Sequence, residues 1–231
     1  MTDPRGYEPT QPRSGFSLKR SLERIGGGIV FLGGLALKWG FVFAKFFALF
    51  ISVGAYTLWF GSWTFAVGFV LLILVHELGH AAEAKRQGLQ VSLPTFIPFF
   101  GAFVTIRHAG LSPWRNALVS LAGPFAGGLA CCVVWAVAEA HDSHLLLTLA
   151  NIGFLINAFN LLPIGFLDGG QIFRSAVAAW RMPVIRYEGA VPVQALAPDR
   201  ARALAIWTLY FLLAGGLVLG MLATKPSGAT F

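Results

Sequence analysis

Long apolar stretches dominate this sequence and restrict its fold more than any other feature. Five of them reach the length of about 20 residues that a helix needs to cross the hydrocarbon core of a bilayer. They cover residues 41–60, 63–87, 114–139, 145–167 and 200–223. Only 12% of the residues are charged, against about 25% in soluble domains, which excludes an ordinary soluble domain. We expect an all-α polytopic membrane protein with five or six transmembrane helices.

The chain outside these stretches differs in character along its length. Residues 1–40 begin as a tail rich in Pro, Gly, Arg and Ser and continue as a glycine-rich apolar segment. We expect a cytoplasmic tail with an interfacial segment there, and whether residues 25–40 enter the membrane is left open. Residues 41–223 then form the expected membrane core, and residues 224–231 form a short tail.

Residues 93–106 are apolar but too short to cross a membrane. Pro94, Pro98 and Gly101 lie among them and argue against a helix. Non-helical backbone is tolerated at membrane depth where protein or a water-filled cavity satisfies its polar groups. We therefore expect a short re-entrant or extended hairpin segment at this place.

Positively charged residues are concentrated on one side of the predicted membrane core. All but one of the 17 lysines and arginines lie before or at the start of the first stretch, between the second and third or at their facing ends, or between the fourth and fifth or at their facing ends. Cytoplasmic loops carry such an excess, so we expect the N-terminus in the cytoplasm. The net charge of +7 comes from these residues on the cytoplasmic side. We therefore expect no nucleic-acid partner. We expect an integral protein of the cell membrane of a prokaryote.

The motif His76-Glu77-Leu78-Gly79-His80 lies inside the second apolar stretch. Histidines four residues apart share one helical face, so their imidazoles can converge on one Zn²⁺ ion. Glu77 then lies beside the metal, where it can take a proton from a bound water. The alternative, two packing histidines and a paired glutamate, carries little weight because ionisable groups at membrane depth are costly and usually functional.

Two histidines leave a catalytic zinc short of one protein ligand, and two carboxylates are candidates. Glu83 lies about 10 Å along the helix from His76, too far to share one ion, and we interpret it as solvated or paired with Arg86. Asp168 follows the fourth stretch at its cytoplasmic end, at a depth that matches the histidines. Asp168 is therefore the better candidate for the third zinc ligand. It could also form a turn at the end of the fourth stretch, and this would be compatible with binding zinc.

A second motif runs from Asn160 through Pro163 to Asp168-Gly169. Together with the first, it resembles the paired signature of the site-2 protease family of intramembrane zinc metalloproteases, which is HExxH on one span and NxxPxxxxDG on a later one. Both patterns match without a substitution. The Pro-Phe-Phe-Gly-Ala-Phe-Val and Ser-Leu-Ala-Gly-Pro segments between them also resemble family segments, so the resemblance covers about residues 41–180.

The resemblance implies a role for each matching residue. His76, His80 and Asp168 would be the ligands of one Zn²⁺ ion per chain, Glu77 the catalytic base, and Asn160 a catalytic residue near them, with the active site towards the cytoplasmic side. Family members often carry a PDZ or CBS module. The loop between the third and fourth stretches is too short for a PDZ domain, and the tail after the fifth is too short for a CBS module, so we expect a minimal core.

The second motif also has a physical interpretation of its own. Pro163 lacks an N–H group, so the helix should kink or open there. Asn157 and Asn160 form a polar stripe that should face the protein interior or a water-filled cavity. Interhelical hydrogen bonding is an equal alternative to catalysis for these two side chains, and the motif favours catalysis for Asn160.

Two glycines, Gly123 and Gly127, lie one helical turn apart in the third apolar stretch. Small residues at this spacing let transmembrane helices approach closely. We interpret the pair as a packing face rather than as a site.

The expected function is that of an intramembrane zinc endopeptidase acting within or near the transmembrane segment of a membrane-protein substrate. Zinc would lower the pKa of water, and Glu77 would accept its proton and then donate it to the leaving amine. Two alternatives stay open. One is a zinc-binding membrane protein that acts as a sensor or transporter without proteolytic activity. The other is a structural membrane protein that binds no metal. The sequence leaves the substrate and the oligomeric state open.

Overall fold

The structure is a computed structural model. It describes residues 47–97, 101–107, 111–188 and 191–225, together with seven earlier residues: Gly34, Leu37, Trp39, Gly40, Val42, Ala44 and Lys45. Two compact units, residues 1–44 and 45–231, divide the chain, and the second holds both sequence motifs. The predicted N-terminal tail, apart from the isolated residues just named, and residues 226–231 of the predicted C-terminal tail lie outside the described residues.

Helices form most of the second unit. They are the helix Phe47–Phe60, α2 (Trp63–Arg86), α3 (Pro113–Ala140), α4 (His144–Asn160), α5 (Asp168–Arg181) and α6 (Arg200–Ala223). Three of them, α2, α3 and α6, are long and apolar enough to cross a membrane, and Phe47–Phe60 and α4 are shorter apolar helices. The predicted helical membrane fold is confirmed to this extent, and the count of five or six spans stays a prediction.

Capping residues set the ends of the long helices. Ser62, Ser112 and Asp199 each accept a hydrogen bond from the backbone N–H three residues further on, which satisfies a donor that the first helical turn leaves free. Pro113 is the first residue of α3, where its missing N–H costs nothing. Gly88 follows α2 with a φ of 79°, a left-handed conformation that ends helices and favours glycine.

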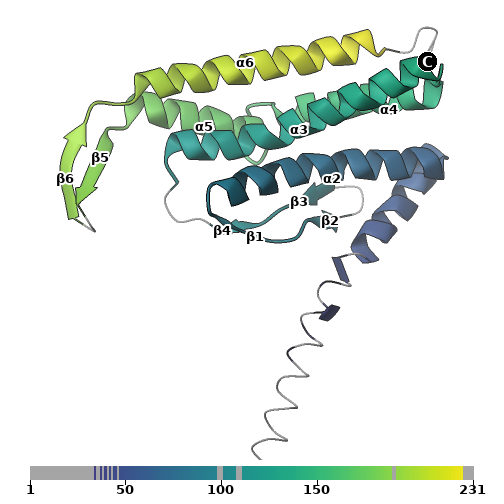
Figure 1. Cartoon of the computed structure of the whole chain (residues 1–231), viewed down its shortest axis with the longest axis horizontal. Helices are drawn as coiled ribbons and strands as arrows, with labels where there is room; N and C mark the ends of the chain where they lie inside the picture. The colour runs from purple at the N-terminus through teal and green to yellow at the C-terminus, as the bar shows by residue number, and fades with distance from the viewer. Residues whose placement is uncertain are drawn as a thin grey trace, which may run out of the picture. The chain divides into compact units, whose positions relative to one another are not determined.

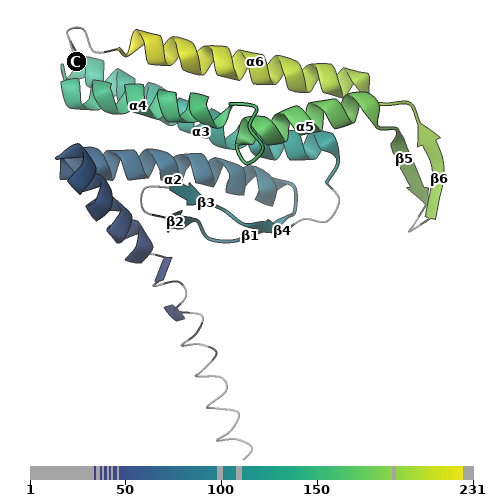
Figure 2. The same cartoon turned by 180° about the vertical axis from the view of Figure 1, so that it is seen from behind.

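The helices pack around α3, which contacts α2, α4, α5 and α6. In Figures 1 and 2, α2 lies on one side of α3, and α6 runs along α4 and α5 on the other. Large buried side chains from α2, α4 and α6 fill the space between them, among them Phe69, Leu72, Phe154, Ile206 and Leu217. This packing fixes α2, α4 and α5 relative to one another, and these helices carry the two motifs.

The fourth predicted stretch, residues 145–167, is not one helix. α4 ends at Asn160, residues 161–167 form turns, and α5 begins at Asp168. Pro163 explains the break, because it has no N–H for a helical hydrogen bond and its ring excludes the preceding turn. Asp168 therefore belongs to the first turn of a separate helix rather than to the end of the fourth span.

Short antiparallel ladders lie beside α2 (Figure 1). β1 (Gln90–Val91) pairs with β4 (Ile106–Arg107), and β2 (Thr95–Ile97) pairs with β3 (Gly101–Phe103). The described part of residues 93–106 is thus not helical, and its entry into the membrane stays a prediction.

A third ladder pairs β5 (Val184–Glu188) with β6 (Val191–Leu196). It connects α5 to α6 and extends beyond the ends of both helices in both views (Figures 1 and 2). No part of the sequence analysis predicted this hairpin.

Candidate metal centre

α2 carries three buried polar residues in its second half: His76, Glu77 and His80. The two histidines are one turn apart on the same face, and their Nε2 atoms are 3.1 Å from each other. Gly79 lies between them against α3, where an added Cβ would overlap the backbone of Ala122. The close approach of α2 and α3 therefore surrounds the histidines with protein.

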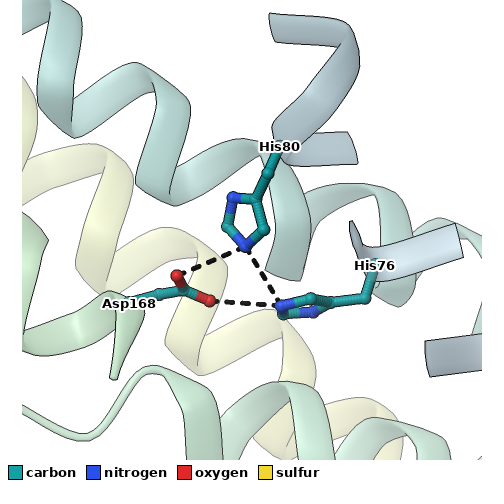
Figure 3. A group of neighbouring side chains, drawn as sticks. All are labelled: His76, His80 and Asp168. Carbon is teal, nitrogen blue, oxygen red and sulfur yellow. Dashed lines mark hydrogen bonds and ion pairs between the residues drawn. The ribbon is translucent and has the colours of Figure 1, made fainter. Parts of the chain in front are cut away.

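Asp168 reaches the histidines from the start of α5 (Figure 3). Its Oδ2 atom is 3.2 Å from His76 Nε2, and its Oδ1 atom is 3.3 Å from His80 Nε2. The ligand atoms of the three residues all lie within 4.8 Å of one another, a group that could hold a metal ion. The structure thus brings together the three residues that the sequence pointed to as metal ligands.

Glu83, the rejected candidate, lies elsewhere. Its Oε2 atom is 2.6 Å from Arg86 Nε, and its Oε1 atom accepts a hydrogen bond from Gln87 at 2.7 Å. The interpretation of Glu83 as the partner of Arg86 is therefore confirmed.

The other nitrogen of each imidazole is already engaged. His80 Nδ1 is 2.7 Å from the carbonyl oxygen of Val119, and His76 Nδ1 is 2.9 Å from Oδ1 of Asn157. A carbonyl oxygen can only accept, so each Nδ1 carries a proton, and in the neutral imidazole each Nε2 then has a free lone pair. Two lone pairs and a carboxylate facing one another repel unless a cation lies among them. Two imidazoles and one carboxylate are a donor set typical of catalytic zinc, so the residues fit this ion.

Glu77 lies beside the two histidines and Asp168, and its side chain is turned towards the segment that follows β3. It is buried, and its carboxylate accepts a hydrogen bond from the backbone N–H of Val104, just after β3. The segment that follows α2 thus approaches the carboxylate next to the candidate metal position.

A cavity of about 820 Å³ opens onto the site, and it is lined by His76, Glu77, His80, Asp168 and Asn160. Asn160 is the last residue of α4, is half-buried, and makes no side-chain hydrogen bond with another described residue. Most of the remaining wall is apolar, including Tyr56, Trp59, Ala102, Phe103, Phe159 and Phe166. The cavity thus offers an apolar surface for a substrate next to polar groups that can hold water.

Two features of the site had little or no signal in the sequence. The Val119 carbonyl is a backbone group, so no residue type marks it. Gly123 and Gly127 were interpreted as a packing face, and they do lie against α2 and α4. Their neighbours, however, are residues of the site. A Cβ at Gly123 would overlap the His80 ring, and one at Gly127 would overlap the Asn157 amide. Their spacing was the signal for close approach, although it did not show what approaches.

The sequence profile of peptidase family M50 matches residues 64–142 and 136–194. These ranges cover more than half of the chain and include both motifs. This chain belongs to peptidase family M50, the site-2 protease family. The resemblance expected from the two motifs is therefore confirmed, and the family together with the three long apolar helices identifies an integral membrane protein.

Several curated proteins are similar to this member of family M50. A zinc metalloprotease of Methanocaldococcus jannaschii is 29% identical over 121 residues, 49% of this chain and 35% of the relative. The putative zinc metalloprotease Rip3 of Mycobacterium tuberculosis is 30% identical over 173 residues, 69% of this chain and 43% of the relative. Stage IV sporulation protein FB of Bacillus subtilis is 33% identical over 107 residues, 45% of this chain and 36% of the relative. The chain thus spans less than half the length of these relatives.

Zinc is the metal that the family and its relatives' names point to. Within the described part of the chain, His76, His80 and Asp168 are the group that could hold it.

Proposed function

We propose that this chain is an intramembrane zinc endopeptidase that hydrolyses a peptide bond within or near the transmembrane segment of another membrane protein. The observation that carries the proposal is the meeting of His76, His80 and Asp168 at 3.1–3.3 Å beside the buried Glu77. Membership of family M50 supports the same conclusion.

The chemistry follows from the residues around the cavity. A zinc ion held by the three ligands would supply a Lewis acid that lowers the pKa of water and polarises a peptide carbonyl. Glu77 takes a proton from the attacking water as its oxygen adds to the carbonyl carbon. The same carboxyl group then gives that proton to the amide nitrogen as the C–N bond breaks. Asn160 projects into the cavity from α4 and donates a hydrogen bond to the substrate backbone.

The substrate is a transmembrane helix that must unwind locally, because a helix holds its carbonyls in hydrogen bonds. Residues of β3 line the cavity, and the adjoining Val104 binds Glu77. An extended substrate can add to such a strand by backbone hydrogen bonds. Ala102→Pro, compared with Ala102→Val, tests this step: unchanged cleavage by the proline variant would exclude strand pairing.

The membrane arrangement is part of the same proposal. Five helices cross the bilayer of the cell membrane, with the N-terminus and the site towards the cytoplasm. The distribution of lysine and arginine supports this orientation. Reporter fusions after Phe60, after His141 and after the last helix would measure it directly.

A zinc-binding membrane protein without proteolytic activity is the other candidate. It would need the three ligands but neither a buried glutamate beside them nor a cavity of about 820 Å³. These two features favour the protease.

The decisive experiment compares wild type with Glu77→Gln and Glu83→Gln, purified in detergent. Zinc per chain is measured for each, together with cleavage of a panel of single-span membrane proteins. We expect zinc in all three and cleavage by the wild type and Glu83→Gln only. Zinc in all three without cleavage by any would favour the non-proteolytic alternative, and a wild type without zinc after metal addition would refute the proposal.

A further inference from the structure

A chain of hydrogen bonds leads from α4 to the candidate metal position through Asn157. The Nδ2 atom of Asn157 donates to the carbonyl oxygen of Gly153, one turn earlier in α4, at 2.8 Å. Its Oδ1 atom is 2.9 Å from His76 Nδ1. The Nε2 atom of the same imidazole faces Asp168 and His80. One side chain thus connects the backbone of α4 to a predicted metal ligand of α2.

The hydrogen bonds decide how the Asn157 amide and the His76 ring are oriented. The carbonyl oxygen of Gly153 can only accept, so the amide nitrogen must face it and the amide oxygen must face His76. That oxygen can in turn only accept, so His76 carries its proton on Nδ1. The Nε2 lone pair is then free to bind a metal.

The Asn157 amide is closely surrounded by protein. Asn157 is 2% exposed. On the side of α3, a Cβ at Gly127 would overlap the amide, and Cys131 Sγ lies 3.9 Å from its nitrogen. The amide is therefore enclosed by α3, and its hydrogen bonds to Gly153 and His76 set which way it faces.

The two histidines differ in the kind of group that binds their Nδ1 atom. His80 is held by the Val119 carbonyl, which no substitution of a side chain removes. His76 depends on a side chain, and nothing else among the described residues bonds its Nδ1. A substitution at position 157 can therefore remove the Nδ1 partner of His76 without touching a ligand, whereas no side-chain substitution removes the Nδ1 partner of His80.

We propose that Asn157 is a positioning residue of the metal centre. Its amide oxygen holds His76 in the Nδ1–H tautomer and aims Nε2 at the zinc ion. The inference deepens the proposed function in that it assumes the zinc site, but it does not depend on which bond the protein cleaves. Loss of a hydrogen-bond partner of this kind lowers metal affinity about 10–100-fold in other zinc sites.

Three variants of the full-length protein in detergent separate positioning from general packing. Asn157→Leu has a similar size but no acceptor for His76. Asn157→Asp keeps an oxygen towards His76 Nδ1, replaces the donor to Gly153 by a second oxygen, and adds a negative charge. Asn151→Leu is the matched control: Asn151 lies on the same helix and bonds the Met221 carbonyl at 2.6 Å and Thr224 Oγ1 at 3.2 Å, away from the site.

Zinc affinity is measured by equilibrium competition with a chelator, and circular dichroism checks that each variant is folded. Visible absorption of the cobalt-substituted protein reports whether the ligand geometry changes. We expect Asn157→Leu to bind zinc about 10–100-fold more weakly with an altered cobalt spectrum, and Asn157→Asp to regain most of that affinity. Asn151→Leu should match the wild type. Where leucine at position 157 prevents folding, Asn157→Ala makes the same comparison.

Three outcomes would overturn the inference. They are wild-type affinity in Asn157→Leu, an equal loss in Asn151→Leu, and no recovery in Asn157→Asp. Cleavage is not part of this measurement. A protein that binds zinc through His76 as described but cleaves nothing would refute the proposed function alone, whereas an active protein whose Asn157→Leu variant holds zinc normally would refute the positioning role alone.

Discussion

The imidazole ring of His80 lies against the backbone of Gly123, so closely that a Cβ at position 123 would overlap the ring. The ring is buried and its Nδ1 is bound to the Val119 carbonyl on the same helix as Gly123. It cannot move away without breaking that bond. The absence of a side chain at Gly123 is therefore a condition for the position of a candidate metal ligand.

We expect Gly123→Ala to displace His80 and to weaken zinc binding at least as much as the loss of an outer partner, about 10–100-fold. Gly215→Ala is the control, since that glycine lies on α6 with open space at its Cβ position. Alanine in a helix is more favourable than glycine by about 0.5–1 kcal/mol, so the control should be at least as stable as the wild type. Chelator competition and thermal unfolding measure the two effects. Normal zinc affinity in Gly123→Ala would show that the ring can shift at no cost.

Asp168→Asn tests the choice between the two carboxylates. The aspartate lies 3.2–3.3 Å from both imidazoles, and its replacement removes one of three ligands and the negative charge. Zinc affinity should fall by more than the roughly 100-fold that is lost when a hydrogen-bond partner of a metal ligand is removed. Glu83→Gln, which alters contacts with Arg86 and Gln87 away from the site, should leave zinc content unchanged. Metal analysis after dialysis against a chelator distinguishes the two variants, and an equal loss in both would contradict the assignment.

Tyr210 holds the turn that precedes Asp168. Its hydroxyl donates to the carbonyl oxygen of Leu161 at 2.6 Å. The same carbonyl group packs against Gly169, where an added Cβ would overlap it. Tyr210→Phe leaves the carbonyl without this donor, which costs about 1–3 kcal/mol for a buried group. Each kcal/mol lowers the unfolding midpoint by about 2–4 °C in a chain of this size.

Thr208→Val is the comparison for Tyr210→Phe, because the Thr208 hydroxyl bonds only the Leu204 carbonyl within α6. Its midpoint in detergent should stay close to that of the wild type. A similar midpoint for both variants would mean that the bond to Leu161 adds nothing to stability.

The sequence predicted the first motif well because one helix contains it. Residues four apart meet on a helix whatever surrounds them, so His76 and His80 could be paired without a structure. The predicted stretches 114–139 and 200–223 likewise begin close to the starts of α3 and α6, where the caps Ser112 and Asp199 act through the next three residues only.

Longer-range features were less accessible. The apolar composition of residues 145–167 hid the end of α4 at Asn160, although Pro163 pointed to a disturbance there. Asp168 was matched to the histidines by depth along a helix that does not reach it; it meets them because α5 begins at that residue. The bond from Val119 to His80 depends on how α3 packs on α2, and the sequence shows the glycines that permit such packing but not the carbonyl that results.

Asn160 and Asn157 are one turn apart on α4, and we predict that they affect different quantities. Asn157 contacts a candidate metal ligand, whereas Asn160 lines the cavity and has no side-chain hydrogen bond within the described part of the chain. Asn160→Leu should therefore keep zinc and lower turnover. A lost hydrogen bond to a reacting substrate costs about 10²–10³-fold in kcat when it stabilises developing charge. Zinc per chain and cleavage rate, measured on the same preparation as Asn157→Leu, give the comparison. Loss of zinc in Asn160→Leu would place Asn160 in the support of the metal rather than at the substrate.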